Sequence, residues 1–236
     1  ESLEVIDTPE YARPTLPYAA YMPPGPFEKE QKGLFYVTPV DASRSAEAQE
    51  RQLRGHSNHT IPVVALHEGY PGHHLQLVRA NAAPRVIRKI SWSTVWGEGW
   101  ALYCEEMMWE AGFFSDTRTR LGQLKAVLWR AARIVVLVGL QLGEMSVDEA
   151  VEFMMDEVGH ERVNATAEVK RYTSHPTQPP SYMIGKREIL KIRADFERSA
   201  GSGFSLRTFH DRRRDLFNLQ PSLARVALGL DDAANI

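Results

Sequence analysis

One stretch constrains this chain more than any other, the ten-residue run HEGYPGHHLQ at 67–76. It places three imidazoles, a carboxylate and an amide directly behind the apolar segment 61–66. A hydrolytic metal ion needs neutral imidazole ligands, a further protein ligand, an open position for water and a carboxylate that takes the proton of that water. His67 and Glu68 are adjacent, so one can bind a metal while the other faces the water. The stretch therefore predicts the core of a metal hydrolase.

The spacing of the imidazoles does not fit the standard His-Glu-x-x-His motif, because Pro71 stands where the second His belongs. In a regular helix His74 would lie about 20° from His67 and His73 about 120° away, which favours His74 as the second ligand. Pro71 breaks such a helix, and the glycines on either side of it permit other backbone conformations. After a break, either imidazole can reach the metal, so geometry leaves this choice open.

Together with GEGWALYCEE at 97–106, the run resembles the bacterial DUF885 family. The family pattern is His-Glu-x-x-Pro-Gly-His-x-x-Gln, followed by Glu-Gly-Trp-Ala-x-Tyr-x-Glu, and its members have zincin-like metallopeptidase character. The resemblance implies that His67, His73 and Glu98 bind one zinc ion and that Glu68 is the general base. It also implies that this chain is the C-terminal catalytic portion of such a protein.

Glu98 and Glu105 lie seven residues apart in an apolar segment, 95–111, so both project from nearly the same face of the expected helix. Carboxylates on so apolar a face need compensation. A metal would compensate Glu98, and a hydrogen bond to a metal-bound imidazole would compensate Glu105. The alternative is a solvated acidic stripe on a half-exposed helix.

The predicted fold is mostly α, a zincin-like helical metallohydrolase domain with a small N-terminal β element. Residues 1–236 are expected to form a single catalytic domain, because 43% hydrophobic content over this length can bury one sizeable core. The proline-rich region 1–40 predicts extended chain, with 16–22 and 33–38 as a hairpin or two edge strands. An edge strand could hold a peptide by backbone pairing, although covering the helical core is the simpler role.

The region 41–230 is expected to form the helical metal-binding core. Residues 116–142 predict one long helix whose centre is apolar nearly all round, so it should run through the core. Ser146 and Glu149 form a capping box at the start of the next helix. The DUF885 pattern usually has an Asp and a His on the long helix where this chain has Leu137 and Gln141, and a Lys where it has Met183. These departures put an identical substrate preference in doubt.

Further site residues come from the region that resembles the family pattern Glu-x-x-Arg-Tyr, then Pro-x-Gln, then Ser-Tyr-Lys-x-Gly. Tyr182 is the first candidate for a donor to the oxygen that becomes negative during hydrolysis, against the alternative of a packed aromatic ring. Arg171 and Arg193 are candidates for holding a substrate carboxylate, against ordinary pairing with surface carboxylates. The residues expected to orient ligands or bind substrate are His74, Glu105, Tyr172, Arg171 and Arg193.

Charge and hydropathy limit the partners of the chain. With 28 basic and 30 acidic residues the net charge is −2, so no global field favours nucleic acid or an anionic membrane. No apolar run approaches the roughly 18 residues of a membrane span. The chain begins at Glu1 without Met or an apolar leader, which predicts a processed product or a fragment lacking an N-terminal segment or partner chain. The compartment, cytoplasmic or exported, and the oligomeric state stay open.

Three functions are compatible with these residues. The first is a zinc-dependent metallopeptidase acting on a peptide or small amide. The second is a metal-dependent hydrolase of a non-peptide amide or ester, which the departures at Leu137 and Gln141 keep open. The third is a non-catalytic binding module that retains the fold, and it predicts no stoichiometric metal in the purified protein.

Overall fold

A three-stranded sheet forms the N-terminal part of the computed structural model, which describes residues 2–13, 16, 18–55, 57–213, 216 and 219–230. Its strands are β1 (Ser2–Asp7), β2 (Ala19–Met22) and β3 (Lys32–Val37), in the order β1-β3-β2. β2 and β3 are antiparallel, which confirms the expected hairpin, whereas β1 adds a parallel strand on the other side of β3. β2 is therefore one edge of the sheet.

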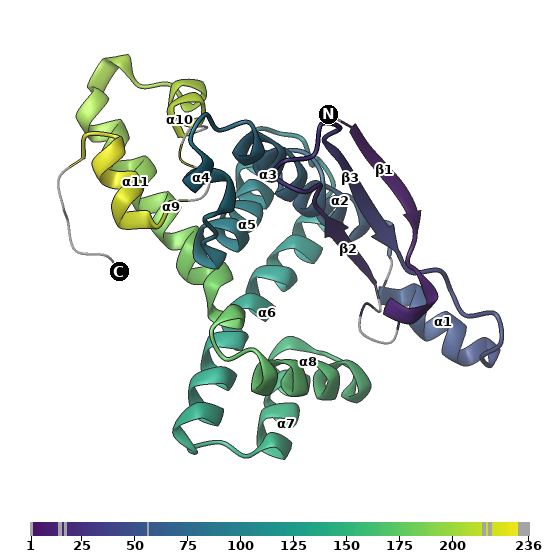
Figure 1. Cartoon of the computed structure of the whole chain (residues 1–236). Coiled ribbons are helices and arrows are strands. Elements are labelled where there is room, and N and C mark those ends of the chain that lie inside the picture. Colours follow the sequence, from purple (N-terminus) through teal and green to yellow (C-terminus); the bar gives the residue numbers. More distant parts are fainter. Residues whose placement is uncertain are drawn as a thin grey trace.

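Helices make up most of the remaining described chain, so the predicted mostly α fold with a small β element is confirmed (Figure 1). The α-helices are α1 (Ala46–Gly55), α2 (Ile61–Glu68), α3 (His73–Asn81), α4 (Val86–Ile90), α5 (Thr94–Glu110), α6 (Thr117–Leu142), α7 (Val147–Val158), α8 (Arg162–Ser174), α9 (Gln178–Ala200), α10 (Leu206–Arg213) and α11 (Pro221–Ala227). Two short 3₁₀ helices are η1 (Glu10–Ala12) and η2 (Gly201–Gly203).

Local capping explains where the long helices begin. Ser146 accepts from the N–H of Glu149, whose side chain accepts from Ser146 N–H, so the predicted capping box of α7 is present. The side chain of Asp116 accepts from Thr119 N–H at the start of α6. α6 ends at Gly143, whose φ of 71° lies in the left-handed region that glycine adopts readily. These signals are all local, which is why the sequence predicts them well.

The chain breaks between α2 and α3, at the Pro-Gly step inside the HEGYPGHHLQ run. The Tyr70–Pro71 peptide bond is cis, and Gly72 N–H donates to the carbonyl of Leu66 at 3.1 Å. A Cβ at Gly72 would overlap the carbonyl oxygen of His67, so only glycine allows the chain to pass this close. The indole of Trp100 in α5 donates to Pro71 O at 2.9 Å and so holds the segment between α2 and α3 against α5.

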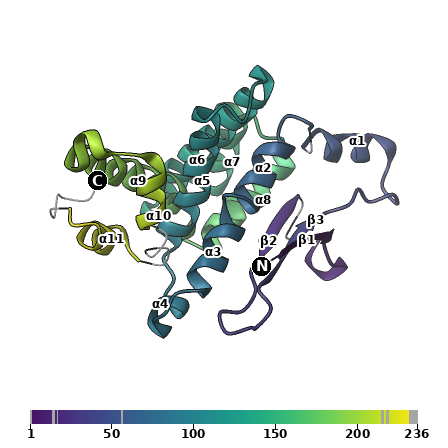
Figure 2. The same cartoon turned by 90° about the horizontal axis from the view of Figure 1, so that it is seen from above.

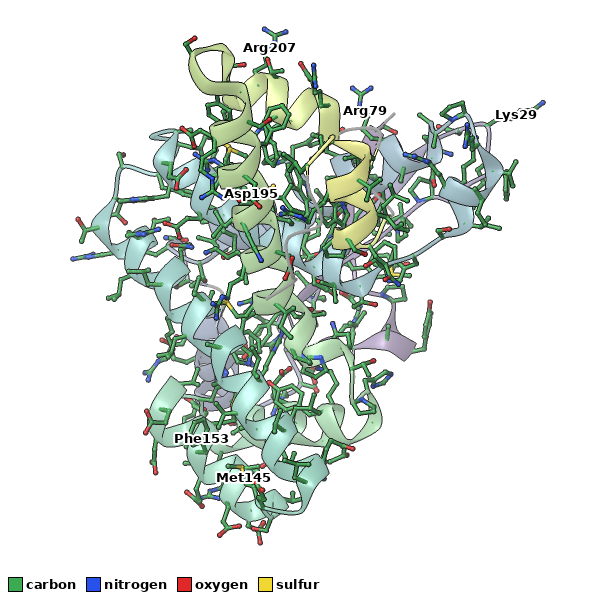
Figure 3. The ribbon with its side chains drawn as sticks, turned by 90° about the vertical axis from the view of Figure 1, so that its left-hand side faces the viewer. Lys29, Arg79, Met145, Phe153, Asp195 and Arg207 are labelled. Atoms are coloured by element: carbon green, nitrogen blue, oxygen red, sulfur yellow. The ribbon has the colours of Figure 1, made fainter. Side chains whose placement is uncertain are left out.

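Two apolar clusters hold the helices together. The larger one joins α2, α5, α9 and the C-terminal helices, and α5 packs along α9 over most of its length. The smaller one joins α6, α7 and α8. In Figure 1 the α6–α7–α8 group and the sheet lie on different sides of α5, and Figure 2 shows the sheet opposite α9, α10 and α11. Met145 and Phe153 lie at the end of the molecule opposite Arg207 (Figure 3).

The long helix α6 differs from its prediction. It does not run through the core, because one face is exposed, with apolar side chains at Leu121, Leu124, Leu128, Val135, Val138 and Leu142. The opposite face is buried and carries Arg133 and Gln123 among its apolar residues. Apolar residues occur nearly all round this helix in the sequence, so the sequence does not indicate that the buried face also carries polar residues. Within the part of the chain that the structure describes, no helix is long and apolar enough to cross a membrane.

Candidate metal centre

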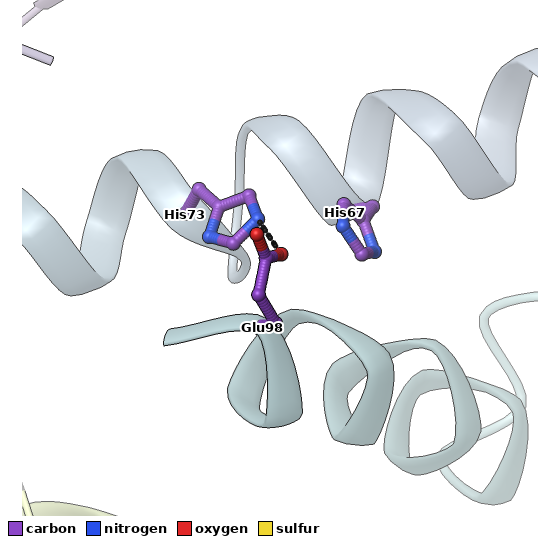
Figure 4. Close-up of side chains that lie close together, drawn as sticks. All are labelled: His67, His73 and Glu98. Carbon is purple, nitrogen blue, oxygen red and sulfur yellow. Dashed lines mark ion pairs between the residues drawn. The ribbon is translucent and has the colours of Figure 1, made fainter. Parts of the chain in front are cut away.

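Two helix ends and a third helix converge on one point. His67 stands in the last turn of α2, His73 opens α3 after the break, and Glu98 lies in the second turn of α5. One ligand atom from each of these three residues lies within 4.8 Å of the others. Figure 4 shows the two imidazoles on successive helices, with the carboxylate of Glu98 rising toward them from α5. The structure thus brings together the three ligands that the family resemblance implies.

The imidazole of His67 is oriented by Glu105, also on α5. His67 Nδ1–H donates to Glu105 Oε1 at 2.7 Å, and both side chains are almost completely buried. This leaves Nε2 of His67 to face His73 and Glu98. A carboxylate behind a ligating imidazole fixes its tautomer and increases its basicity, which is the role expected for Glu105.

The carboxylate of Glu98 is held on one side only. Gln178 Nε2 donates to Oε1 at 2.9 Å, whereas Oε2 lies 3.3 Å from His73 Nε2 and is buried without a hydrogen bond from any described residue. Burial raises the pKa of Glu98, but His73, the charge of His67 and the Gln178 amide together lower it to about 2. Burial likewise lowers the pKa of His73, and the neighbouring carboxylates, Glu98 first, outweigh it and raise this pKa.

The donor set fits zinc. Two imidazole nitrogens and one carboxylate oxygen are ligands that Zn²⁺ takes in hydrolytic sites, where a fourth position stays open for water. The buried oxygen Glu98 Oε2 has no hydrogen bond from the described residues, and a cation would compensate it. His67 already donates its second ring N–H to a carboxylate, as zinc-bound histidines commonly do. His67, His73 and Glu98 would therefore hold the ion.

Glu68 lies beside the ligands and is held by the edge of the sheet. The backbone N–H of Tyr21 in β2 donates to Glu68 Oε2 at 3.2 Å. Just before β2, the carbonyl of Tyr18 accepts from the N–H of Thr38, which follows β3. By strand alternation, the backbone groups of Ala19 and Tyr21 therefore point away from β3. The free edge of β2 therefore borders the centre at Glu68.

His74 does not join the ligand cluster. Its ring is fully buried, and its two nitrogens hydrogen-bond to the hydroxyls of Tyr21 at 3.0 Å and Tyr70 at 2.9 Å. The break between α2 and α3 turns α3 so that His73, and not His74, faces His67. His74 instead joins α3 to β2 through Tyr21. It lies next to the ligands, as expected, and helps to position these two elements.

Tyr182 on α9 lies against the centre. Its ring is stacked on that of His67, with 6.4 Å between centroids and 18° between planes, and its hydroxyl accepts from Gln178 Nε2 at 2.9 Å. Burial and the charge of Glu98 raise the pKa of Tyr182 to about 12, so the hydroxyl stays protonated. The geometry is compatible with the predicted donor, and Gln178 joins this hydroxyl to Glu98.

The two arginines predicted to bind a substrate carboxylate have other partners. Arg171 donates to Glu168 at 3.0 Å and to Gln178 Oε1 at 2.7 Å, so it orients the amide that holds Glu98. Arg193 pairs with Glu110 at 3.0 Å, near the C-terminal end of α5, and the structure does not bring it to the ligands. Arg193 lies eleven positions after Tyr182 along α9, and its expected role in binding a substrate carboxylate stays a prediction.

Tyr172 follows Arg171 on α8, where it is fully buried against α6. Its hydroxyl donates to Glu168 Oε2 at 2.8 Å and accepts from Arg133 Nε at 3.2 Å. Tyr172 therefore supports the polar groups behind the site and does not contact the ligand cluster in the described structure.

Sequence reasoning missed the roles of Tyr21 and Gln178. Gln178 was visible as part of the family pattern, but only its contact with Glu98 shows what it does. The departures from the family pattern lie away from the ligands, since Leu137 packs in the α6–α7–α8 cluster and Gln141 is exposed. Met183 follows Tyr182 on α9 and is half-buried.

Comparisons with known proteins agree with this geometry at the level of family and fold. The family model DUF885, described as a bacterial protein of unknown function, matches residues 1–213. No curated protein matches the chain.

Two solved structures share the fold along almost the whole chain. One is a candidate lipoprotein of unknown function from Shewanella oneidensis, 29% identical, with a TM-score of 0.82 over 95% of this chain and 40% of that one. The other is a candidate lipoprotein from Colwellia psychrerythraea, 26% identical, with a TM-score of 0.84 over 96% of this chain and 37% of that one. The chain thus spans less than half the length of either protein.

Proposed function

Because the chain belongs to the DUF885 family of bacterial proteins, whose function is unknown, we propose a function from the site itself: a zinc-dependent metallopeptidase, zincin-like in its arrangement. One observation carries the proposal, the approach of ligand atoms of His67, His73 and Glu98 to within 4.8 Å beside the carboxylate of Glu68. When bound there, zinc would polarise a substrate carbonyl and lower the pKa of water to about 7.

The residues of the chain divide the remaining work. Glu68, held by Tyr21 N–H, takes the proton of the attacking water and later passes it to the leaving amine. Tyr182 donates its hydroxyl hydrogen to the carbonyl oxygen as negative charge develops on it. Glu105 and Gln178 keep His67 and Glu98 in position, so that little rearrangement is needed during the reaction.

An edge strand beside the centre supports a peptide substrate over other amides. The backbone groups of Ala19 and the carbonyl of Tyr21 point away from β3 and are placed to pair with an extended main chain, whereas Tyr21 N–H already donates to Glu68. The descriptions of the two similar structures as lipoproteins support, in addition, an exported location for this protein.

Metal analysis tests the ligand set. After zinc loading and removal of excess metal, we expect elemental mass spectrometry to give about one zinc ion per chain. His67→Ala and His73→Ala should each contain clearly less zinc. His74→Gln should keep its zinc, because His74 bonds to tyrosines, and His175→Ala on the surface serves as a matched histidine control. Full zinc content in both ligand variants would refute the centre.

The catalytic role of Glu68 needs a separate variant. Glu68→Gln should retain zinc while turnover of a peptide panel falls by about 10²–10⁴-fold, the usual contribution of a general base. A panel that pairs peptides with acylated small molecules tells a peptidase from a hydrolase of other amides or esters. Turnover of Glu68→Gln equal to that of the unaltered protein would overturn the assignment.

A further inference from the structure

Arg133 is an unusual buried charge. It lies on the inner face of α6, only 4% exposed, where Nε donates to Tyr172 and Nη2 to Glu168, both at 3.2 Å. Its third nitrogen, Nη1, is buried and has no hydrogen-bond partner among the described residues. An unsatisfied buried donor costs about 1–3 kcal/mol, and more when it is charged, so this nitrogen needs an explanation.

Arg130 repeats the pattern one turn earlier on α6. Its Nη1 donates only to Ala126 O in its own helix, at 3.2 Å, and its Nε is buried without a hydrogen bond from the described residues. Both guanidinium groups lie over the ring of Tyr182, with Cζ 4.6 Å from its centroid for Arg133 and 5.8 Å for Arg130. Two incompletely bonded cations therefore converge on a residue of the candidate centre.

The charges around these arginines do not balance. One carboxylate, Glu168, is shared by Arg133 and Arg171. Burial raises the pKa of Glu168, but these two arginines outweigh burial and lower the pKa to about 2. Arg130 forms no ion pair among the described residues. His160 adds no counter-charge, because an imidazole is neutral or positive, and burial keeps it neutral by lowering its pKa to about 4. Two of the three guanidinium groups near Tyr182 thus share Glu168, and the third, that of Arg130, has no carboxylate partner among the described residues.

Stacking on aromatic rings does not explain the arrangement. Both guanidinium groups also lie on Trp129, with Cζ 4.4 Å from its ring for Arg133 and 4.8 Å for Arg130. Stacking satisfies the faces of a guanidinium, but its N–H donors lie in the plane and still need acceptors. A carboxylate supplies two acceptor oxygens and one negative charge in the same plane.

We infer that Arg133 and Arg130 form a carboxylate subsite next to the metal centre, and that the substrate carries a free carboxylate close to the cleaved bond. The ring of Tyr182 contacts both His67 and the two arginines, so the subsite is one aromatic ring away from the ligands. The substrate carboxylate and the cleaved bond must therefore lie on opposite sides of one aromatic ring. About two residues of extended chain cover this separation, since each spans at most about 3.6 Å.

The inference rests on the proposed peptidase function and narrows it to a carboxypeptidase type. Peptides whose C-terminal carboxylate follows the cleaved bond by one or two residues would be cleaved, and their C-terminal amides would be poor substrates. The two arginines bind and position the substrate, whereas the bond-breaking groups stay at Glu68 and the ligands. Arg171, the residue expected from the sequence for this task, instead supports Gln178.

A pair of probes tests the subsite without depending on catalysis. N-acetylated tripeptides with a free carboxylate or with a carboxamide at the C-terminus are titrated calorimetrically into zinc-free protein. We expect the acid to bind about tenfold or more tightly than the amide, the range of hydrogen bonds to charged groups. Equal affinities of the unaltered protein for acid and amide would overturn the subsite, and this comparison needs no variant.

Variants then assign the preference to residues. Arg133→Met and Arg130→Met should each reduce the acid-over-amide ratio, and Arg130→Met covers the case in which loss of Arg133 prevents folding. Arg162→Met is the control, because Arg162 pairs with Glu152 at the surface and its side chain is 60% exposed, so the ratio should not change. A folded Arg130→Met protein with an undiminished ratio would contradict the assignment.

Turnover of the zinc-loaded protein separates the two proposals. Cleavage of acid and amide peptides with equal kcat/KM would refute the subsite and leave the peptidase standing. Tighter binding of the acid without cleavage of either peptide would support the subsite and refute the peptidase.

Discussion

The helices α5 and α9 meet at two glycines, Gly99 and Gly185, so substitution of Gly185 should lower the stability of the protein. A Cβ added at Gly185 would lie 2.8 Å from Gly99 Cα and closer still to the carbonyl oxygen of Val95. Both are backbone atoms, so no change of side-chain rotamer can relieve the overlap. Gly185→Ala therefore forces the two helices apart.

The size of the effect follows from the contact distances. Carbon atoms pack at about 3.5–4.0 Å, so the helices must separate by roughly 1 Å at the crossing. Overpacking a close contact costs about 1–3 kcal/mol, and the backbone overlap puts this variant at the upper end, partly offset by the better helix propensity of Ala, about 1 kcal/mol. We expect a net loss of about 2 kcal/mol in the free energy of unfolding.

The same displacement should reach the candidate centre. Glu98 precedes Gly99 on α5, and Tyr182 lies one turn before Gly185 on α9, so zinc affinity should fall along with stability. Thermal unfolding measures the first effect, with a decrease of roughly 4–8 °C in Tm, and competition with a chelator measures the second.

Gly122→Ala in α6 is the matched control for Gly185→Ala. Its Cβ would first meet the methyl group of Thr60, at 3.4 Å, which is an ordinary contact. It should leave zinc affinity unchanged and Tm equal or slightly higher. If Gly185→Ala keeps the Tm and zinc affinity of the unaltered protein, the two glycines do not set the helix spacing.

Two further predictions concern buried carboxylates. Glu105→Ala removes the acceptor behind His67 and should lower zinc affinity about 10–100-fold in a chelator competition, whereas unchanged affinity would show that Glu105 does not orient the ligand. Glu168 has its pKa lowered to about 2, so its stabilisation is complete above the ordinary value of 4.5 and is lost as pH falls toward 2. The shift corresponds to about 3 kcal/mol. Urea unfolding at pH 6 and pH 3 should therefore show a smaller acid-induced loss in Glu168→Gln, and an equal loss in both proteins would contradict the role of this carboxylate.

Much of the helical fold was predictable because its signals are local. Asp116 and the Ser146–Glu149 capping box mark the starts of α6 and α7, and Pro71 with its flanking glycines marks the break before α3. β1 was missed because it pairs in parallel with β3, more than twenty residues away, and nothing within 2–7 specifies that partner. The burial of one face of α6 likewise depends on α8 and α9.

The candidate centre was predictable in its ligands and not in its surroundings. The choice between His73 and His74 depends on how the chain turns at Pro71, and a regular helix favours the residue that the structure excludes. Arg133 is one of several basic residues of α6 in the sequence, and only its contacts with Tyr172 and Tyr182 reveal its position. Contacts between distant segments decide these points, and spacing within one segment cannot.

The order of the elements along the chain has a consequence for how the protein is made. The candidate metal ligands all belong to α2, α3 and α5, which end by Glu110, whereas Gln178 and Tyr182 belong to α9. During synthesis on the ribosome all three candidate ligands therefore emerge long before α9, which carries the proposed donor Tyr182. We expect a growing chain to be able to capture its metal while it still lacks the means to select or cleave a peptide. Metal loading and the onset of activity would thus be separate events in the biogenesis of this protein.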